Sequence, residues 1–174
     1  MINLINGKLK TENKQNQIIK NILKHGNYID LLTDFNLNLN KNFNNHWLAG
    51  FSDADASFQI KLLKRNSRVE VRLNFQINQK NRDVLLLIKD FLGGNIGYSK
   101  SQDTYFYSST SFGSAKNVIN YFDKCHLLSS KHVNYLKWRK AYLIIQNKDY
   151  LTENDQDKLI KLKISIDRLS DATV

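Results

Sequence analysis

The chain has 174 residues, a hydrophobic content of 41% and a formal net charge of +10. This length and apolar content suffice for one folded domain with an added arm, which argues against wholesale disorder. The positive charge favours a polyanionic partner, nucleic acid first and an anionic membrane surface second. A single cysteine, Cys125, excludes an internal disulfide framework and a Cys-rich metal site, and no apolar run approaches the roughly 18 residues that span a bilayer.

The first 45 residues differ in composition from the rest of the chain. They contain a weak helical pattern through residues 18–23, and the stretch 36–45 is rich in asparagine, as is typical of a linker. We therefore predict an N-terminal arm over residues 1–45 and a main domain over residues 46–174. The main domain opens with residues 46–55, which have the length and composition of a short helix.

Two strands are predicted next. Residues 57–63 alternate between apolar and polar side chains, and residues 68–78 alternate strictly over eleven positions. This period of two indicates strands that are buried on one side. The apolar side of the second strand carries Val69, Val71, Leu73, Phe75 and Ile77.

The rest of the domain repeats this order. A helix over residues 81–92 ends at Gly93 and Gly94, and a hairpin of strands follows over 95–100 and 104–110. Further helices are predicted over 114–128, over 131–146 and from Thr152 onward. The sequence therefore predicts an α+β domain of αββαββα order, with helices on one face of an antiparallel four-stranded sheet.

The other face of this sheet is predicted to be polar and open to solvent. Arginine can bond guanine through two hydrogen bonds, asparagine and glutamine can bond adenine in the same way, and glutamate can accept from cytosine. A half-exposed strand also needs polar side chains without any ligand, so the pattern alone leaves both interpretations open. The candidate nucleic-acid-binding residues are Gln59, Lys61, Arg68, Glu70, Arg72, Asn74, Gln76, Asn78 and Lys80.

The short helix ends in an unusual way, with "LAGFSDADA" over residues 48–56. Small residues inside a helix allow another backbone to approach closely, which predicts a partner helix. Asp53 and Asp55 lie at the negative end of the helix dipole, where carboxylates are unfavourable unless a cation is near. Two such helices in a symmetric pair would bring carboxylates together around Mg²⁺, an arrangement suited to phosphodiester hydrolysis. Alternatively, both aspartates end the helix and face solvent.

This stretch resembles the motif that gives the LAGLIDADG homing endonucleases their name. The matching residues are Leu48, Ala49, Gly50, Asp53, Ala54 and Asp55, and the resemblance extends over about residues 46–147 through the αββαββα order. Two positions depart from the motif: Ser52 replaces an apolar residue, and Ala56 replaces the final glycine, where it could strain a tight exit from helix to strand.

The resemblance implies roles for particular residues. Asp55 is the implied metal ligand, and the backbone carbonyl of Ala54 can assist it. Gln79 matches a polar residue that positions active-site water. Lys131 lies near the place of a basic residue that stabilises the transition state, and Lys80 competes with it for that role.

The resemblance also implies a function. Members pair their motif helices, so this chain is expected to form a homodimer or to join a second LAGLIDADG half, and to cut double-stranded DNA with Mg²⁺ at an intron-homing site. Two alternatives remain at this stage. The chain could bind group I intron RNA as a maturase, or serve as a non-catalytic subunit of a ribonucleoprotein. The asparagine and lysine content together with the resemblance suggest a mitochondrial gene product.

Overall fold

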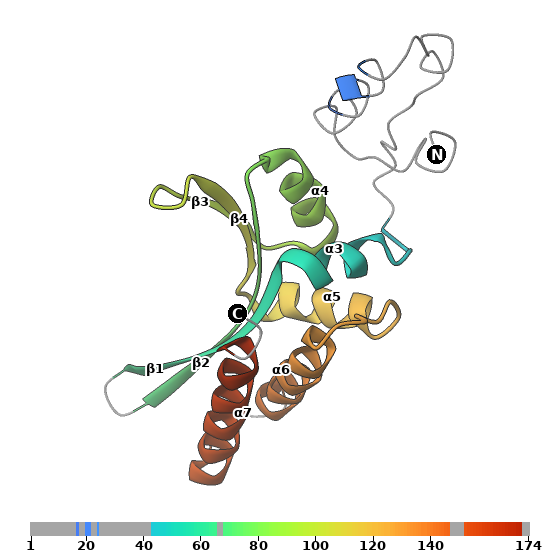
Figure 1. The fold of residues 1–174 in the computed structure, drawn as a ribbon. Helices are drawn as coiled ribbons and strands as arrows, with labels where there is room; N and C mark the ends of the chain where they lie inside the picture. Colours follow the sequence, from blue (N-terminus) through green and yellow to red (C-terminus); the bar gives the residue numbers. More distant parts are fainter. Residues whose placement is uncertain are drawn as a thin grey trace. The chain divides into compact units, whose positions relative to one another are not determined.

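The computed structural model describes residues 43–65, 68–146 and 152–171, together with Gln17, Lys20, Asn21 and Lys24. The chain divides into two compact units, residues 1–41 and 42–174. The second unit contains the fold described below (Figure 1). Within the described residues, no helix combines the length and apolar character needed to cross a membrane.

The sheet has four antiparallel strands in the order β1-β2-β4-β3. Strand β1 spans Ala56–Arg65 and pairs along its whole length with β2, Arg68–Gln79. Strands β3, Asn95–Ser99, and β4, Thr104–Ser109, form the second hairpin. Strand β4 joins the first hairpin through residues 75–79 of β2 alone, so the outer part of β1 and β2 is a two-stranded ribbon.

The predicted α+β class and αββαββα order are confirmed. Helix α3 spans Trp47–Asp55, α4 spans Arg82–Leu92 and α5 spans Phe112–Phe122. Helices α6, Lys131–Gln146, and α7, Glu153–Asp171, follow. Alternate residues of β1 and β2 are buried beneath these helices, so the sheet has one packed face and one polar face.

The core below the sheet is rich in aromatic rings. Phe58 and Phe75 lie opposite each other on β1 and β2 with ring centroids 5.0 Å apart. Phe122 of α5 and Trp138 of α6 pack on the Phe58 ring at 5.8 and 5.6 Å. Both aromatic residues from the helices have no exposed surface. This packing fixes α5 and α6 against β1 and β2.

Two details of the predicted helices were wrong. Helix α5 ends at Phe122, not near residue 128, because the backbone turns there and the amides of Lys124 and Cys125 both donate to the carbonyl of Tyr121. The apolar spacing of α6 runs through Val133 and Leu136 and would place both on the inward face, yet they are 46% and 49% exposed. Larger aromatic side chains at other positions of α6 take the core positions.

The change from Gly to Ala at the end of the motif costs no backbone strain. Ala56 has φ −92° and ψ 157°, ordinary extended values that any residue adopts, and its side chain is buried. The expected strain at this position is therefore absent. The exit from α3 instead leads directly into β1, which places the end of the helix at the edge of the sheet.

Candidate active site and nucleic-acid interface

The carboxylate of Asp55 marks the point where α3 meets the sheet. Asp55 is the last residue of α3 and is exposed. Because Ala56 pairs with Ile77, the end of β2 passes beside the end of the helix. The side-chain amide of Gln79 there donates to Asp55 Oδ2 at 2.5 Å. The structure thus brings together the two residues that the resemblance assigned to the metal and to active-site water.

Lys131 approaches the same point from the start of α6. Its Nζ donates to the carbonyl oxygen of Ala54 at 2.7 Å and to that of Ser52 at 3.5 Å. These carbonyls belong to the last turn of α3, the negative end of its dipole, so the ammonium supplies the cation that this end requires. Burial lowers the pKa of Lys131, and the charges of Asp55 and Asp53 partly oppose that shift.

Lys80 was the competing basic candidate. It is exposed just beyond the end of β2. Of the two lysines, Lys131 has a hydrogen bond to the end of α3 in the described contacts. The geometry therefore favours Lys131 as the basic group of this site, and Lys80 remains a candidate for nucleic-acid contact.

Asp53 holds the loop that precedes α6. Its carboxylate accepts hydrogen bonds from the backbone N–H of Leu128, at 2.8 Å, and of Ser129, at 3.2 Å. The Ser129 hydroxyl donates to it as well, at 2.6 Å. Since this loop leads directly into α6, Asp53 fixes the position from which Lys131 reaches back to α3.

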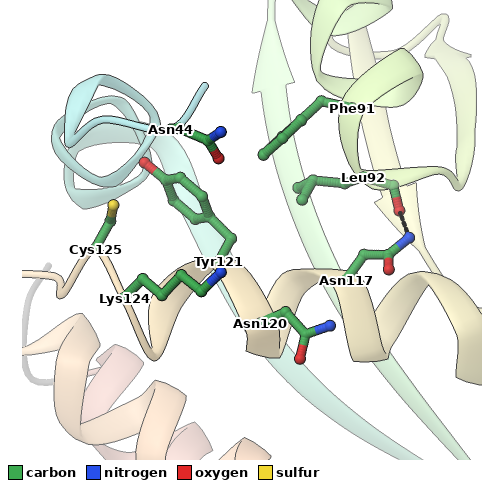
Figure 2. Close-up of a pocket in the computed structure, with 8 residues that line it drawn as sticks. All are labelled: Asn44, Phe91, Leu92, Asn117, Asn120, Tyr121, Lys124 and Cys125. Carbon is green, nitrogen blue, oxygen red and sulfur yellow. Dashed lines mark hydrogen bonds between the residues drawn. The ribbon is translucent and has the colours of Figure 1, made fainter. Parts of the chain in front are cut away.

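The beginning of α3 is held by a hydroxyl group. Tyr121 donates to the carbonyl of Asn45 at 2.7 Å and accepts from the backbone N–H of Ala49 at 2.9 Å. Tyr121 also lines a pocket of about 400 Å³. Figure 2 shows this pocket, with Asn117 donating to the Leu92 carbonyl. Both ends of α3 are therefore anchored by side-chain hydrogen bonds.

The oxygen atoms at the end of α3 fit a magnesium ion in kind. The Asp55 carboxylate and the Ala54 carbonyl are hard oxygen donors of the kind that Mg²⁺ prefers. In this structure the Ala54 carbonyl accepts a hydrogen bond from the Lys131 ammonium, so a positive group already lies beside it. Within the described residues, however, no three His, Cys, Asp or Glu side chains gather into a group that could hold a metal ion. Magnesium commonly takes one or two carboxylates and completes its coordination with water and phosphate oxygens.

The polar face of the sheet carries most of the predicted nucleic-acid contacts. Gln59, Lys61, Gln76 and Asn78 lie on it and are exposed or half-buried. Glu70 and Arg72 form an ion pair of 2.7 Å on the same face. Lys80 follows the end of β2, and the side chain of Arg68 lies outside the described residues.

Asn74 differs from its prediction as an exposed base-reading residue. It is 2% exposed, because its Nδ2 donates to Gln59 Oε1 at 3.1 Å and to Gln76 Oε1 at 3.3 Å. Its own Oδ1 is buried without a partner among the described residues. Asn74 thus orients two neighbouring amides in this structure.

Sequence reasoning missed the contribution of the second hairpin to this face. Gln76 pairs with Ser108, and Ser108 pairs with Asn95, which extends the polar row across all four strands. Phe106 lies on the same face, opposite Asn78 and Gly97. The alternation in "TYFYSS" was available in the sequence, but three consecutive aromatic residues hid which of them face outward.

Comparison with known proteins places this arrangement in a family. The family model described as LAGLIDADG endonuclease matches residues 48–142, from α3 through all four strands and into α6. The chain belongs to the LAGLIDADG endonuclease family. The match covers more than half of the chain and includes Asp55, Gln79 and Lys131.

Particular relatives of this LAGLIDADG chain bear on its function. The 37.2 kDa protein of cox1 intron 2 from Schizosaccharomyces pombe is 63% identical over 163 residues, which cover 92% of this chain and 50% of that protein. The LAGLIDADG homing endonuclease I-SmaMI, solved bound to cleaved DNA, shows 34% identity and a TM-score of 0.63 over 68% of this chain and 42% of its own. An archaeal intron-encoded homing endonuclease, I-Vdi141I, solved in complex with DNA, shows 29% identity and a TM-score of 0.64 over 70% of this chain and 80% of its own. The chain thus spans about half the length of the first two.

Proposed function

We propose that this chain is one half of a site-specific DNA endonuclease, which hydrolyses phosphodiester bonds with Mg²⁺ at an intron-homing site. The observation that carries the proposal is the meeting of three segments at the end of α3. The Asp55 carboxylate, the Gln79 amide and the Lys131 ammonium converge there, beside a polar sheet face. The DNA-bound state of the neighbouring structures supports DNA over intron RNA as the partner.

Each group at this point has a distinct chemical task. The Asp55 carboxylate would hold Mg²⁺, with the Ala54 carbonyl as a further ligand once the Lys131 ammonium leaves it, and the bound ion would stabilise charge on the phosphate oxygens and favour ionisation of water. The Gln79 amide fixes the orientation of the Asp55 carboxylate and keeps a second N–H free to position a water molecule. The Lys131 ammonium holds positive charge where the cleaved phosphate gains negative charge.

The exposed glycine surface of α3 supports pairing through this helix. Gly50 is exposed on this helix, and a Cβ atom built on it meets nothing within 4 Å. An open glycine surface lets a second helix approach closely. A second copy of this chain would supply a second Asp55 at the same point. The other LAGLIDADG half of a longer protein would supply its own carboxylate there, and the S. pombe relative is long enough to contain such a half.

The relative's intron also supports a mitochondrial origin for this chain, because cox1 is a mitochondrial gene. A homing endonuclease encoded by such an intron would act on the intron-free copy of the same gene. The exon junction of cox1 is therefore the first DNA to test.

The experiment combines binding and cleavage. The full chain is incubated with a plasmid that carries the intron-free cox1 junction of S. pombe, and in parallel with a pool of randomised duplexes. MgCl₂ is added in one series and EDTA in the other. We expect a defined double-strand break with MgCl₂, none with EDTA, and recovery of related sequences from the pool. Failure to retain any duplex from the pool would overturn the proposal.

A matched pair of variants separates catalysis from binding. Asp55→Asn keeps the size and the hydrogen bond to Gln79 but removes the charge, so DNA binding should persist while cleavage is lost. Asp157→Asn, on the exposed surface of α7, is the control and should leave both unchanged. Equal cleavage by the Asp55→Asn variant would remove this carboxylate from the mechanism.

A further inference from the structure

We infer that the DNA half-site recognised by this chain is rich in A·T pairs over about four base pairs nearest the cleavage position, and that Phe106 contacts a thymine methyl group there. The inference rests on the proposed function and adds the base composition of its substrate. It follows from the part of the polar face closest to Asp55, which we call the inner block. The inner block comprises Ser57, Gln59, Asn74, Gln76, Asn78, Asn95, Phe106 and Ser108.

The strand register defines the size of the inner block. Its residues occupy three successive cross-strand rows, centred on Asn74, Gln76 and Asn78 of β2. Rows on one face are two residues apart, or about 6.6 Å, and a DNA strand advances about 3.4 Å per nucleotide. Three rows therefore extend over about four base pairs. They begin beside Gln79 and Asp55, so they lie nearest the point of cleavage.

The inner block is neutral. None of its eight side chains is ionisable, whereas the charged residues Lys61, Glu70 and Arg72 lie farther out on the ribbon and Lys80 lies beyond the end of β2. Arginine and lysine are the residues that most often bond guanine, through its O6 and N7 atoms. Asparagine and glutamine instead match the N6 donor and N7 acceptor of adenine. The composition of the inner block thus favours adenine over guanine.

Hydrogen bonds connect the amides of the inner block, and both chains of bonds start at Asn74. Asn74 donates to Gln76, and Gln76 Nε2 donates to Asn78 Oδ1 at 2.9 Å. Asn74 also donates to Gln59, whose Nε2 donates to Ser57 at 3.3 Å. Each glutamine uses one N–H and one acceptor position in this network, which leaves a second N–H and a second acceptor position for a base. The network holds these amides in place before DNA arrives.

Phe106 is the apolar member of the inner block. It lies on the polar face between Asn78 and Gly97, and it is half-buried. A Cβ atom on Gly97 would approach the Phe106 ring to 2.3 Å, so glycine at this position lets the ring lie across β3. An aromatic ring on a base-reading surface makes apolar contact with the C5 methyl group, which thymine alone among the four bases carries in the major groove.

Base analogues test the inference without changing the protein. Duplexes are first selected from the randomised pool, and their inner segment is located from the mapped cleavage positions. Thymine in that segment is then replaced by uracil, which lacks the methyl group, and adenine by 7-deazaadenine, which lacks N7. We expect a majority of A·T pairs in the segment and a loss of affinity of about fivefold or more for either replacement. The same replacements in the outer segment are the control and should change affinity less than twofold.

Two variants assign the effects to residues. Phe106→Leu should abolish the difference between thymine and uracil, and Gln76→Arg should change one selected A·T pair to G·C. Lys61→Gln, outside the inner block, should weaken binding and its salt dependence and leave the inner preference unchanged. Selected sites that are rich in G·C in the inner segment, or affinity that is insensitive to both analogues, would overturn the inference while the proposed function stands. A chain that binds no duplex DNA would overturn the proposed function itself.

Discussion

The two aspartates of the motif should give opposite results when each loses its charge. Asp53 accepts three hydrogen bonds from the loop before α6, whereas Asp55 is exposed and interacts with one amide. We therefore expect Asp53→Asn to destabilise the fold and to displace Lys131. Asp55→Asn should leave the fold intact and remove cleavage.

The contacts set the size of these effects. Hydrogen bonds to a charged acceptor contribute about 1.5–3 kcal/mol each when desolvated, but the donors here are exposed and water can replace the carboxylate. Taking about 0.5 kcal/mol for each of three bonds gives a loss of roughly 1–2 kcal/mol for Asp53→Asn. Asp55→Asn removes a negative charge from the negative end of the helix dipole, which stabilises the helix and offsets the weaker hydrogen bond to Gln79. The free energy of unfolding should therefore change by no more than about 0.5 kcal/mol.

Thermal unfolding measures the difference directly. For a unit of this size, 1 kcal/mol corresponds to roughly 4 °C in Tm, so Asp53→Asn should lower Tm by about 4–8 °C. Single-turnover cleavage should then fall in both variants, with DNA affinity changed little by Asp55→Asn. An unchanged Tm for Asp53→Asn, or a fall larger than about 4 °C for Asp55→Asn, would refute the separation of roles.

Three further predictions follow from the fold. Gly50→Ala should raise the stability of the isolated chain by about 0.5–1 kcal/mol, since the Cβ enters open space, yet shift any dimer toward monomer on dilution in light scattering. Ser52→Ala should raise the free energy of unfolding in urea by about 1 kcal/mol, because the Ser52 hydroxyl is buried with no partner among the described residues. Burial raises the pKa of Tyr107, Tyr121 and Tyr135 above the ordinary 10.0, so the folded chain keeps protons that the unfolded chain loses. The contribution of these tyrosines to stability should therefore be constant below about pH 10 and fall above it, as circular dichroism during alkaline titration would show; a rise above that pH would contradict this sign.

Periodicity predicted most of the fold because the strands and their ends carry strong local signals. Strict alternation marked β2, and Gly93 and Gly94, both with positive φ, ended α4 as expected. The end of α5 was missed for a physical reason. Cys125 and Leu127 continue the apolar pattern of the helix, but they fill the core from a loop, and periodicity cannot distinguish the two cases.

The site was predicted in part, through the resemblance rather than the residue pattern. Spacing alone placed Asp53 and Asp55 together at a helix end and could not separate their roles, because the partners of Asp53 lie more than seventy residues away. Asn74 illustrates the same limit. Alternation placed it on the polar face correctly, but its burial arises from neighbouring amides on two strands, which no local pattern encodes.

The two-stranded ribbon gives the polar face a gradient of stiffness. Residues 75–77 of β2 pair with β1 on one side and with β4 on the other, while residues 68–74 pair with β1 alone, with α7 packed beside β1 (Figure 1). Two-stranded ribbons twist more readily than wider sheets. The outer contacts can therefore follow variation in groove shape, while the inner rows tolerate little. A recognition surface built this way would distinguish base pairs strictly near the point of cleavage and tolerate base changes in the outer part of the target. The same protein could then continue to recognise its target gene as that gene diverges.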